Sequence, residues 1–167
     1  MAIAQSDFTL FRGRGYEGQI STIELAEVKS RIVTVDFIPY GRAVVRGAEK
    51  RSCAPVSATS KPGDIIGFTV RSMAEASPTP PNVNGEYATG YPVDHVASIL
   101  RSGPMYALCV DGAKAGEAVV VITKAGENLG RLTAKVEGVK LDFVKWVDDV
   151  IAGEIGEIQT DGVLAAS

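Results

Sequence analysis

The sequence has little of what most enzymes, metal proteins and membrane proteins need. Its 167 residues include one histidine, one tryptophan and two cysteines. Cys53 and Cys109 have no CxxC spacing and no second pair, so they predict two buried free thiols rather than a zinc site or a disulfide framework. No apolar run approaches the roughly 20 residues of a membrane span, and the first residues lack the basic and apolar regions of a secretory signal. We therefore expect no membrane partner.

The chain also lacks a strong charge of either sign. With 17 Lys and Arg against 20 Asp and Glu, the formal net charge is −3, which is small and of the wrong sign for a nucleic-acid-binding protein. The length suits one globular domain. Eighteen glycines and only 7% aromatic residues favour short strands joined by turns over long helices.

Residues of catalytic type are present but isolated. His95 lies in a predicted strand without an HxH or HExxH motif, so we interpret it as a structural or surface residue. Asp148 and Asp149 are neighbours in a predicted solvated turn, where adjacent carboxylates point apart, unlike a glycosidase pair. Residues 13–18 match GxGxxG, but no βαβ pattern follows, which indicates a glycine-rich turn. The sequence predicts no catalytic residue, no metal site, no cofactor and no enzyme activity.

The positive signal is a series of short β-branched runs bounded by glycine and proline. The central one is residues 37–47, where a Pro39-Tyr40-Gly41 corner leads into a strand and a turn. At most a short helical turn is expected at 23–28. Gly67, inside a strand, indicates a bulge or a close backbone approach. Further strands are predicted at 30–36, 53–56, 65–70, 91–100, 105–110, 118–123, 131–136, 140–147 and 154–160, with a turn at 101–104. The expected core includes Val44, Ile66, Phe68, Val120 and Ile122.

About nine or ten such strands predict an all-β fold, a β-sandwich or barrel. We expect an extended N-terminal arm at 1–15, a single β domain at 16–160 and a C-terminal tail at 161–167. A long Pro-rich surface loop is predicted within the domain at 74–90, because loops of this length without secondary structure are uncommon in compact domains. The loop has a second interpretation, an insertion that contacts nothing.

Two segments are candidate contact sites for a partner surface or a second subunit. The arm combines large apolar and cationic side chains, and the loop contains polyproline, which loses little entropy on binding. The arm could equally complete its own sheet or that of a sister subunit. The candidate residues are Phe8, Leu10, Phe11, Arg12 and Arg14 in the arm and Pro78, Pro80 and Pro81 in the loop.

Several short motifs, in this order, resemble the capsid cement (decoration) proteins of tailed bacteriophages. The chain differs from the pattern in the Pro-rich insert and in its extra tail. The motifs are Tyr16-x-Gly18-Gln19, Ser30-Arg31, the corner Ile38-Pro39-Tyr40-Gly41-Arg42-Ala43-Val44, the strand around Gly67 that ends in Arg71, Gly90-Tyr91-Pro92, Ala115-Gly116-Glu117-Ala118-Val119 and Ile155-Gly156-Glu157-Ile158.

The resemblance implies a structural virion protein with a β-sandwich or jelly-roll-like barrel. It implies a homodimer or homotrimer, made in the host cytoplasm, that sits on the outer capsid surface and bridges major capsid proteins of the HK97-type fold. Two alternatives remain. A polysaccharide-binding β-sandwich module, or a small enzyme on that scaffold, would need an exposed aromatic platform or paired carboxylates. A tail or baseplate protein of the same viruses is the other.

Overall fold

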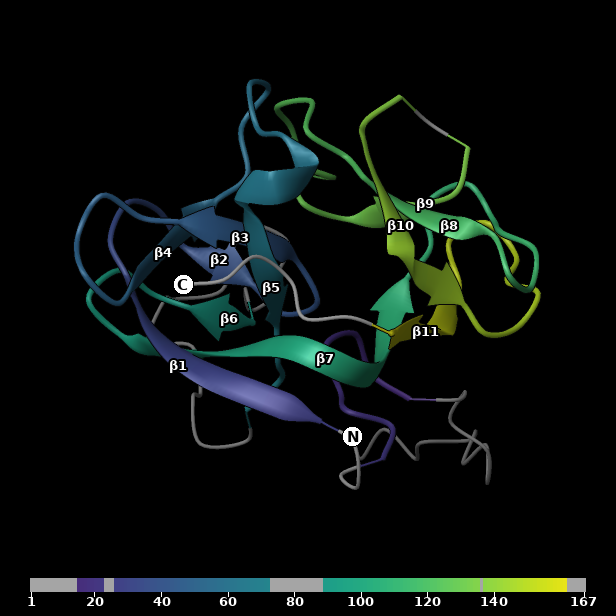
Figure 1. The fold of residues 1–167 in the computed structure, drawn as a ribbon, viewed down its shortest axis with the longest axis horizontal. Coiled ribbons are helices and arrows are strands. Elements are labelled where there is room, and N and C mark those ends of the chain that lie inside the picture. Colours follow the sequence, from purple (N-terminus) through teal and green to yellow (C-terminus); the bar gives the residue numbers. More distant parts are fainter. Residues whose placement is uncertain (1–14, 23–25, 73–88, 136, 162–167) are drawn as a thin grey trace, which may run out of the picture.

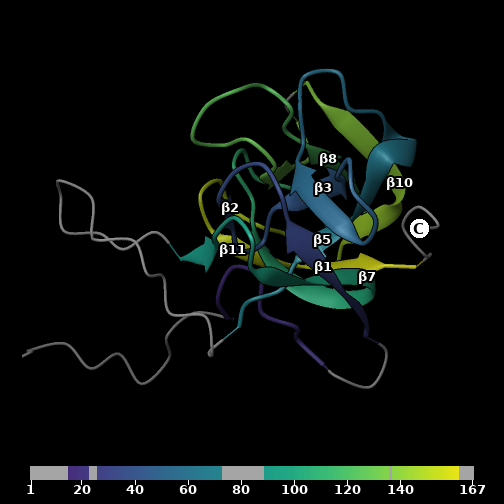
Figure 2. The same cartoon turned by 90° about the vertical axis from the view of Figure 1, so that its left-hand side faces the viewer.

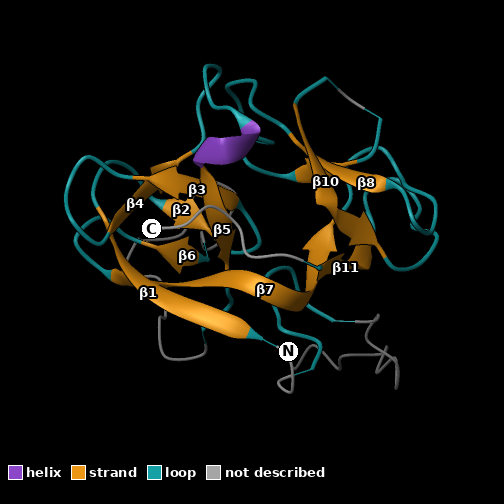
Figure 3. Ribbon diagram, viewed as in Figure 1, coloured by secondary structure: helices purple, strands orange, loops and turns teal. Residues whose placement is uncertain are grey.

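The computed structural model describes residues 15–22, 26–72, 89–135 and 137–161. Within them the fold is almost entirely β, as predicted, and the single helical element is a 3-10 turn, η1 (Figure 3). No helix in these residues is long and apolar enough to cross a membrane. The elements are β1 (Glu27–Val33), β2 (Ile38–Pro39), β3 (Ala43–Arg46), β4 (Ser52–Pro55), η1 (Pro62–Asp64), β5 (Ile65–Thr69), β6 (Gly90–Tyr91), β7 (Val96–Leu108), β8 (Ala118–Val121), β9 (Leu132–Thr133), β10 (Val139–Trp146) and β11 (Ile155–Thr160).

Five strands close into a small barrel at one end of the molecule. Their order is β1-β4-β3-β5-β7, and β1 also pairs with β7, so the ring has no free edge. The β1–β4 pairing is parallel and the other four are antiparallel. The short antiparallel pair β2–β6 lies against this barrel. Figure 1 shows the barrel on the left.

β7 links the two halves of the fold, and it corrects a prediction. Strands at 91–100 and 105–110 with a turn at 101–104 were expected, but residues 96–108 form one strand. The turn signal Gly103-Pro104 acts as a bend instead, with Gly103 at φ 115°. The strand continues through it because partners hold it on both sides: β1 and β5 before the bend, β11 and residues 18–21 after it.

The second half of the sheet runs β7-β11-β10-β8-β9 (Figure 1). It curls until Leu132 in β9 meets Cys109, immediately after β7, in a parallel bridge. The N–H of Val110 donates to the carbonyl of Leu132 over 3.0 Å. β7 is therefore shared by two curled sheets, each of which returns to it.

Two apolar clusters fill the fold. One lies inside the first barrel, with side chains from all five of its strands and from β2 and β6. The other joins the outer face of β3 and β5 to the second sheet. The predicted core residues Val44, Ile66, Phe68, Val120 and Ile122 are all buried, and Phe68 is fully enclosed at 0% exposure.

Two local predictions have different outcomes. The bulge at Gly67 is confirmed: the β3–β5 register shifts there, and a Cβ at Gly67 would lie 2.3 Å from the carbonyl oxygen of Leu100. The prediction of a helical turn at 23–28 is wrong for its last two residues, because β1 already begins at Glu27. Residues 23–25 lie outside the described residues. Pairing with β7 supplies Val28 with a partner that an isolated helical turn would lack.

Candidate functional site

The chain that leads out of the predicted arm is fixed on β7. Ile20 forms an antiparallel bridge with Met105. The N–H of Gly18 donates to the carbonyl of Tyr106, and the N–H of Tyr106 donates to the carbonyl of Gln19, both over 2.8 Å. Residues 18–21 thus add a short strand-like segment to the edge of β7 opposite β11. We call residues 15–19 the arm base.

The base of the Pro-rich loop lies directly beside the arm base. The N–H of Arg71 donates to the carbonyl of Gly18 over 2.6 Å. Tyr40 holds both ends of the loop: its hydroxyl donates to the carbonyl of Ser72 over 3.1 Å, and its N–H donates to the carbonyl of Thr89 over 3.3 Å. The two segments predicted to make contacts therefore leave the folded domain from one place.

Two glycines make this close packing possible. Gly18 and Gly41 have φ of 82° and 71°, in the left-handed region that favours glycine. A Cβ on Gly41 would lie 2.4 Å from Cγ of Glu17, and one on Gly18 would lie 2.8 Å from the backbone nitrogen of Gly41. The N–H of Gly41 also donates to the carbonyl of Thr69 over 2.9 Å. Side chains at these two positions would push the arm base off the corner.

A buried charge cluster lies under the arm base. Oε1 of Glu17 lies 4.0 Å from Nε of Arg42 and 3.7 Å from Nε of Arg131, close enough for ion pairing but too far for hydrogen bonds. Nη1 of Arg42 donates to the carbonyls of Glu127 and Leu129 over 3.1 and 3.0 Å. Glu17 therefore connects the arm base to both the corner and the 126–131 turn.

Burial dominates the ionisation of this cluster. It raises the pKa of Glu17 above its ordinary value, against the opposing charges of Arg42, Arg131 and Arg71. Burial, reinforced by Arg131, lowers the pKa of Arg42 to about 10, while Glu17 opposes that shift. The charges in the cluster are thus maintained at a desolvation cost.

Aromatic contacts complete the site. The guanidinium of Arg71 lies 4.9 Å from the ring centre of Tyr16 and 5.5 Å from that of Tyr40, within the range of cation–π attraction. Tyr40 in turn packs edge-on against Tyr91 at 5.2 Å, and the Tyr91 hydroxyl donates to the carbonyl of Val70 over 2.6 Å. These residues belong to four motifs far apart in the sequence, which the fold brings together.

The candidate contact residues lie outside the described residues: Phe8, Leu10, Phe11, Arg12 and Arg14 of the arm and Pro78, Pro80 and Pro81 of the loop. What sequence reasoning missed is the shared base formed by Tyr16, Glu17, Tyr40, Arg42 and Arg71. The signal was present, since each lies within a motif that carries the family resemblance, but no spacing rule predicts that these motifs meet.

Chemistry elsewhere in the described residues is sparse. His95 is exposed in the bend before β7, not in a strand as predicted, because Asp94 before it adopts φ 65°. Asp149 is exposed as expected, and its carboxylate accepts hydrogen bonds from Nζ of Lys114 and from the N–H of Ala115. The hydrogen bond from Lys114 is the main cause of the lowered pKa of Asp149. No group of three or more His, Cys, Asp or Glu side chains able to hold a metal occurs in this part of the chain.

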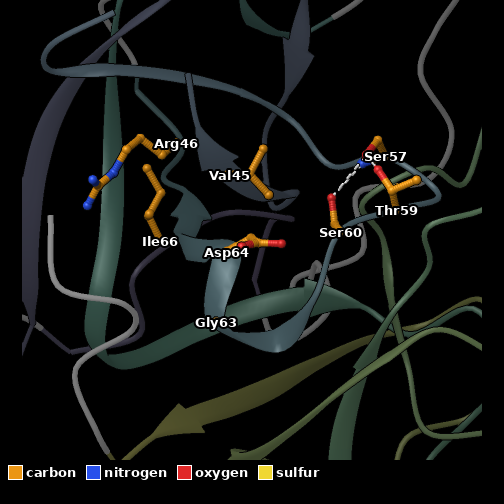
Figure 4. A pocket seen from close by; sticks show the side chains of 8 residues that line it. All are labelled: Val45, Arg46, Ser57, Thr59, Ser60, Gly63, Asp64 and Ile66. Carbon is orange, nitrogen blue, oxygen red and sulfur yellow. Dashed lines mark hydrogen bonds between the residues drawn. The ribbon is translucent and has the colours of Figure 1, made fainter. Parts of the chain in front are cut away.

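An open pocket of about 500 Å³ beside η1 is lined by hydroxyl groups and has no histidine among its lining residues (Figure 4). Ser57, Thr59 and Ser60 hydrogen-bond mainly to one another, and the N–H of Ser57 donates to the Ser60 hydroxyl over 2.9 Å. Arg46 and Asp64 also line the pocket, whereas His95 does not. The hydroxyls close a turn and have no neighbouring imidazole to activate them.

Trp146 cannot serve as a sugar-binding platform, since it is 1% exposed. Its indole N–H points to the carbonyl of Thr133 over 3.5 Å, inside the second apolar cluster. The single tryptophan of the chain is therefore a core residue. This removes the clearest aromatic candidate for the polysaccharide-binding alternative.

Comparison with known proteins gives one family. The model of the family described as structural cement protein (E217 gp24/Pam3 gp6) matches residues 3–161. No curated protein matches the sequence. A chain in a solved structure titled "The capsid of Myoviridae Phage XM1" has a similar fold, with a TM-score of 0.69 and 20% identity over 98% of this chain and 100% of that one.

Proposed function

The chain belongs to the structural cement protein family of phages, and we propose that it performs this capsid cement role on the outer surface of the head, bound to a major capsid protein of the HK97-type fold. The observation that carries the proposal is the extent of the family match, residues 3–161, which includes every motif of the shared arm and loop base. The fold likeness to a chain in the capsid of Myoviridae Phage XM1 supports it.

The shared base suits this role physically. A cement protein binds across a subunit boundary in many copies, so modest contact free energies are multiplied by avidity. A rigid domain that releases two contact segments from one fixed point limits the conformations these segments sample before binding, which lowers the ordering cost. We propose that residues 16–160 form the single positioning domain, while the 1–15 arm and the 74–90 loop make contacts.

Burial of the arm side chains Phe8, Leu10 and Phe11 would contribute about 1.5–3 kcal/mol each before ordering costs. Arg12 and Arg14 would add hydrogen bonds to acidic or carbonyl groups. The prolines of the loop would add contacts at a low entropy cost. We also propose that the protein acts as a homodimer or homotrimer and has no enzyme activity. A turnover abolished by His95→Ala in a folded protein would refute the last point.

The test uses phage heads assembled without the protein. Purified full-length chain is added, the heads are pelleted, and bound protein per head is measured. Three versions are compared: the full chain, a chain without residues 1–14, and a chain with residues 74–88 replaced by a short glycine linker. Oligomeric state is measured on the same samples, since the arm could instead join sister subunits.

We expect saturable binding of the full chain and loss of occupancy without the arm. Unchanged occupancy without residues 1–14, with an intact oligomer, would exclude the arm and leave the loop as the contact. If the full chain does not bind heads but binds a glycan array, the polysaccharide-binding alternative would replace the proposal.

A further inference from the structure

A basic hollow opens at one end of the first barrel, between β1 and the β3–β4 hairpin. Its volume is about 640 Å³. Five cationic side chains and one acidic side chain line it, in a chain whose net charge is −3. The cations are Lys29, Arg31, Arg46, Lys50 and Arg51, and the acidic residue is Glu49. Figure 2 views the molecule from this end.

The cations of the hairpin are held in fixed positions. The Ser52 hydroxyl accepts from the N–H of Glu49 and donates to its carbonyl, over 3.1 and 2.7 Å. The carbonyl of Arg51 accepts from the N–H of Ile32 over 2.9 Å, which ties the hairpin to β1. Arg51 has φ 59°, a left-handed conformation that glycine or asparagine would adopt more easily.

The cations at the tip of the hairpin are available to a partner. Lys50 and Arg51 are exposed, and Arg31 is half-buried. In the described part of the chain, no carboxylate forms an ion pair with Arg31, Lys50 or Arg51, whereas Lys29 pairs with Glu27 over 3.3 Å. The cations of the hollow outnumber its single carboxylate, Glu49, so an acidic partner would reduce the repulsion among Arg31, Lys50 and Arg51.

The opposite end of the molecule is acidic. Two turns, 111–117 and 147–154, are held together there by the Ala113–Val150 bridge and by the hydrogen bond from the N–H of Gly116 to the carbonyl of Trp146. In Figure 1, β1, β3 and β4 lie at one end of the long axis and β8, β10 and β11 at the other. The two turns contain five acidic residues and one basic residue: Asp111, Glu117, Asp148, Asp149 and Glu154, with Lys114. Lys114 forms an ion pair with Asp149 over 2.8 Å, and Lys135 also lines the hollow between the turns, so carboxylates still outnumber cations at this end.

Both ends also expose large apolar side chains. Beside the basic hollow, Ile32 and Val96 are directly paired across β1 and β7 and are 43% and 54% exposed. On the acidic turns, Val147 and Ile151 are 43% and 69% exposed. Exposed apolar groups next to charges of one sign are typical of an interface with a centre that excludes water and a charged rim.

We propose that the basic hollow of one copy binds the acidic turns of a second copy. The chain itself supplies the complementary charge and the apolar groups, so the surface fits another copy better than it fits nucleic acid, which the acidic end would repel. This inference rests on the proposed function, which includes a homodimer or homotrimer, and it assigns the contact between copies to these two surfaces. An antiparallel dimer or a closed ring satisfies both ends of every copy.

The test is sedimentation velocity on the full chain. Wild type, K50E/R51E, D148K/E154K and the matched control K61E/K124E, which reverses exposed cations outside the hollow, are compared at about 0.05 M and about 0.5 M salt. Thermal unfolding checks that each variant is folded. We expect wild type to self-associate, more weakly at high salt, and each reversed variant to lose roughly tenfold or more in affinity. The control should match wild type, and mixing the two reversed variants should restore association.

Two outcomes would overturn the inference: a wild type that is monomeric at all concentrations, or an oligomer that K50E/R51E leaves intact. Head occupancy measured in parallel separates this from the cement role. If wild type binds heads as a monomer, only the contact between copies is wrong. If K50E/R51E keeps its oligomer but loses head binding, the hollow faces the capsid instead.

Discussion

The N–H of Arg71 donates a 2.6 Å hydrogen bond to the carbonyl of Gly18, and this bond joins the bases of the two segments predicted to contact the capsid. Because residue 72 leads into the loop and residue 15 leads into the arm, both segments start from one rigid point. The Arg71 side chain reinforces the junction by lying over the rings of Tyr16 and Tyr40.

Gly41→Ala should destabilise the protein by about 1–3 kcal/mol. The residue has φ 71°, and its new Cβ would lie 2.4 Å from Cγ of Glu17. Urea unfolding measures the change. Gly63→Ala is the matched control, since a Cβ there meets nothing within 4 Å, and it should be nearly neutral. Equal effects of the two substitutions would contradict the packing described at the arm base.

Phe68→Ala should cost roughly 3–5 kcal/mol of unfolding free energy, because it leaves a cavity in the cluster between the two halves. Phe143→Ala provides a comparison of the same chemistry on the surface, where the side chain is 37% exposed. Phe143→Ala should lose much less unfolding free energy than Phe68→Ala. A Phe68 variant as stable as the Phe143 variant would show that the core is not closed as described.

The stability of the Glu17 cluster should depend on pH with a defined sign. Burial raises the folded-state pKa of Glu17 above its unfolded value, so the folded protein binds this proton more tightly. The stabilisation that comes from this tighter proton binding is complete below the unfolded-state pKa of Glu17. It is lost as the pH rises through the folded-state pKa. As the pH falls from about 7 to about 4, the unfolding free energy of the wild type should therefore rise relative to that of Glu17→Gln. If the unfolding free energy instead falls over this range, the arginines lower the pKa of Glu17 by more than burial raises it.

Both cysteines should resist thiol reagents in the native protein. Cys53 and Cys109 are fully buried free thiols. Burial raises the pKa of Cys53 to about 11 and also raises that of Cys109, which leaves little reactive thiolate near neutral pH. Ellman's reagent should react with neither at about pH 8 and with both in urea. Rapid native reaction of either thiol would contradict the described burial.

The sequence predicts the local elements of this fold better than their assembly. The corner at 37–47 and the bulge at Gly67 follow from proline, glycine and β-branched residues, whose preferences act within a few positions. The continuity of β7 does not, since Gly103-Pro104 is a good turn signal that pairing on both edges overrides. Such pairing involves residues far apart in the chain, which a local pattern does not reveal.

The candidate site divides in the same way. Apolar and cationic residues in the arm predict a contact segment from composition alone. The meeting of Glu17 with Arg42 and Arg131 depends on how the second sheet curls back, so no local pattern predicts it. The order of the motifs indicates the family, and the fold gives the reason for four of them: they hold the bases of the arm and the loop together.

The most direct test of the cement role is the thermal stability of the head itself. Heads assembled without the protein are heated in a calorimeter with and without saturating full-length chain, and with the chain lacking residues 1–14 as control. The account predicts that the full chain raises the temperature of head disruption and that the truncated chain raises it less, because binding to the intact lattice stabilises that state by mass action. Heads that bind the full chain yet disrupt at an unchanged temperature would contradict it.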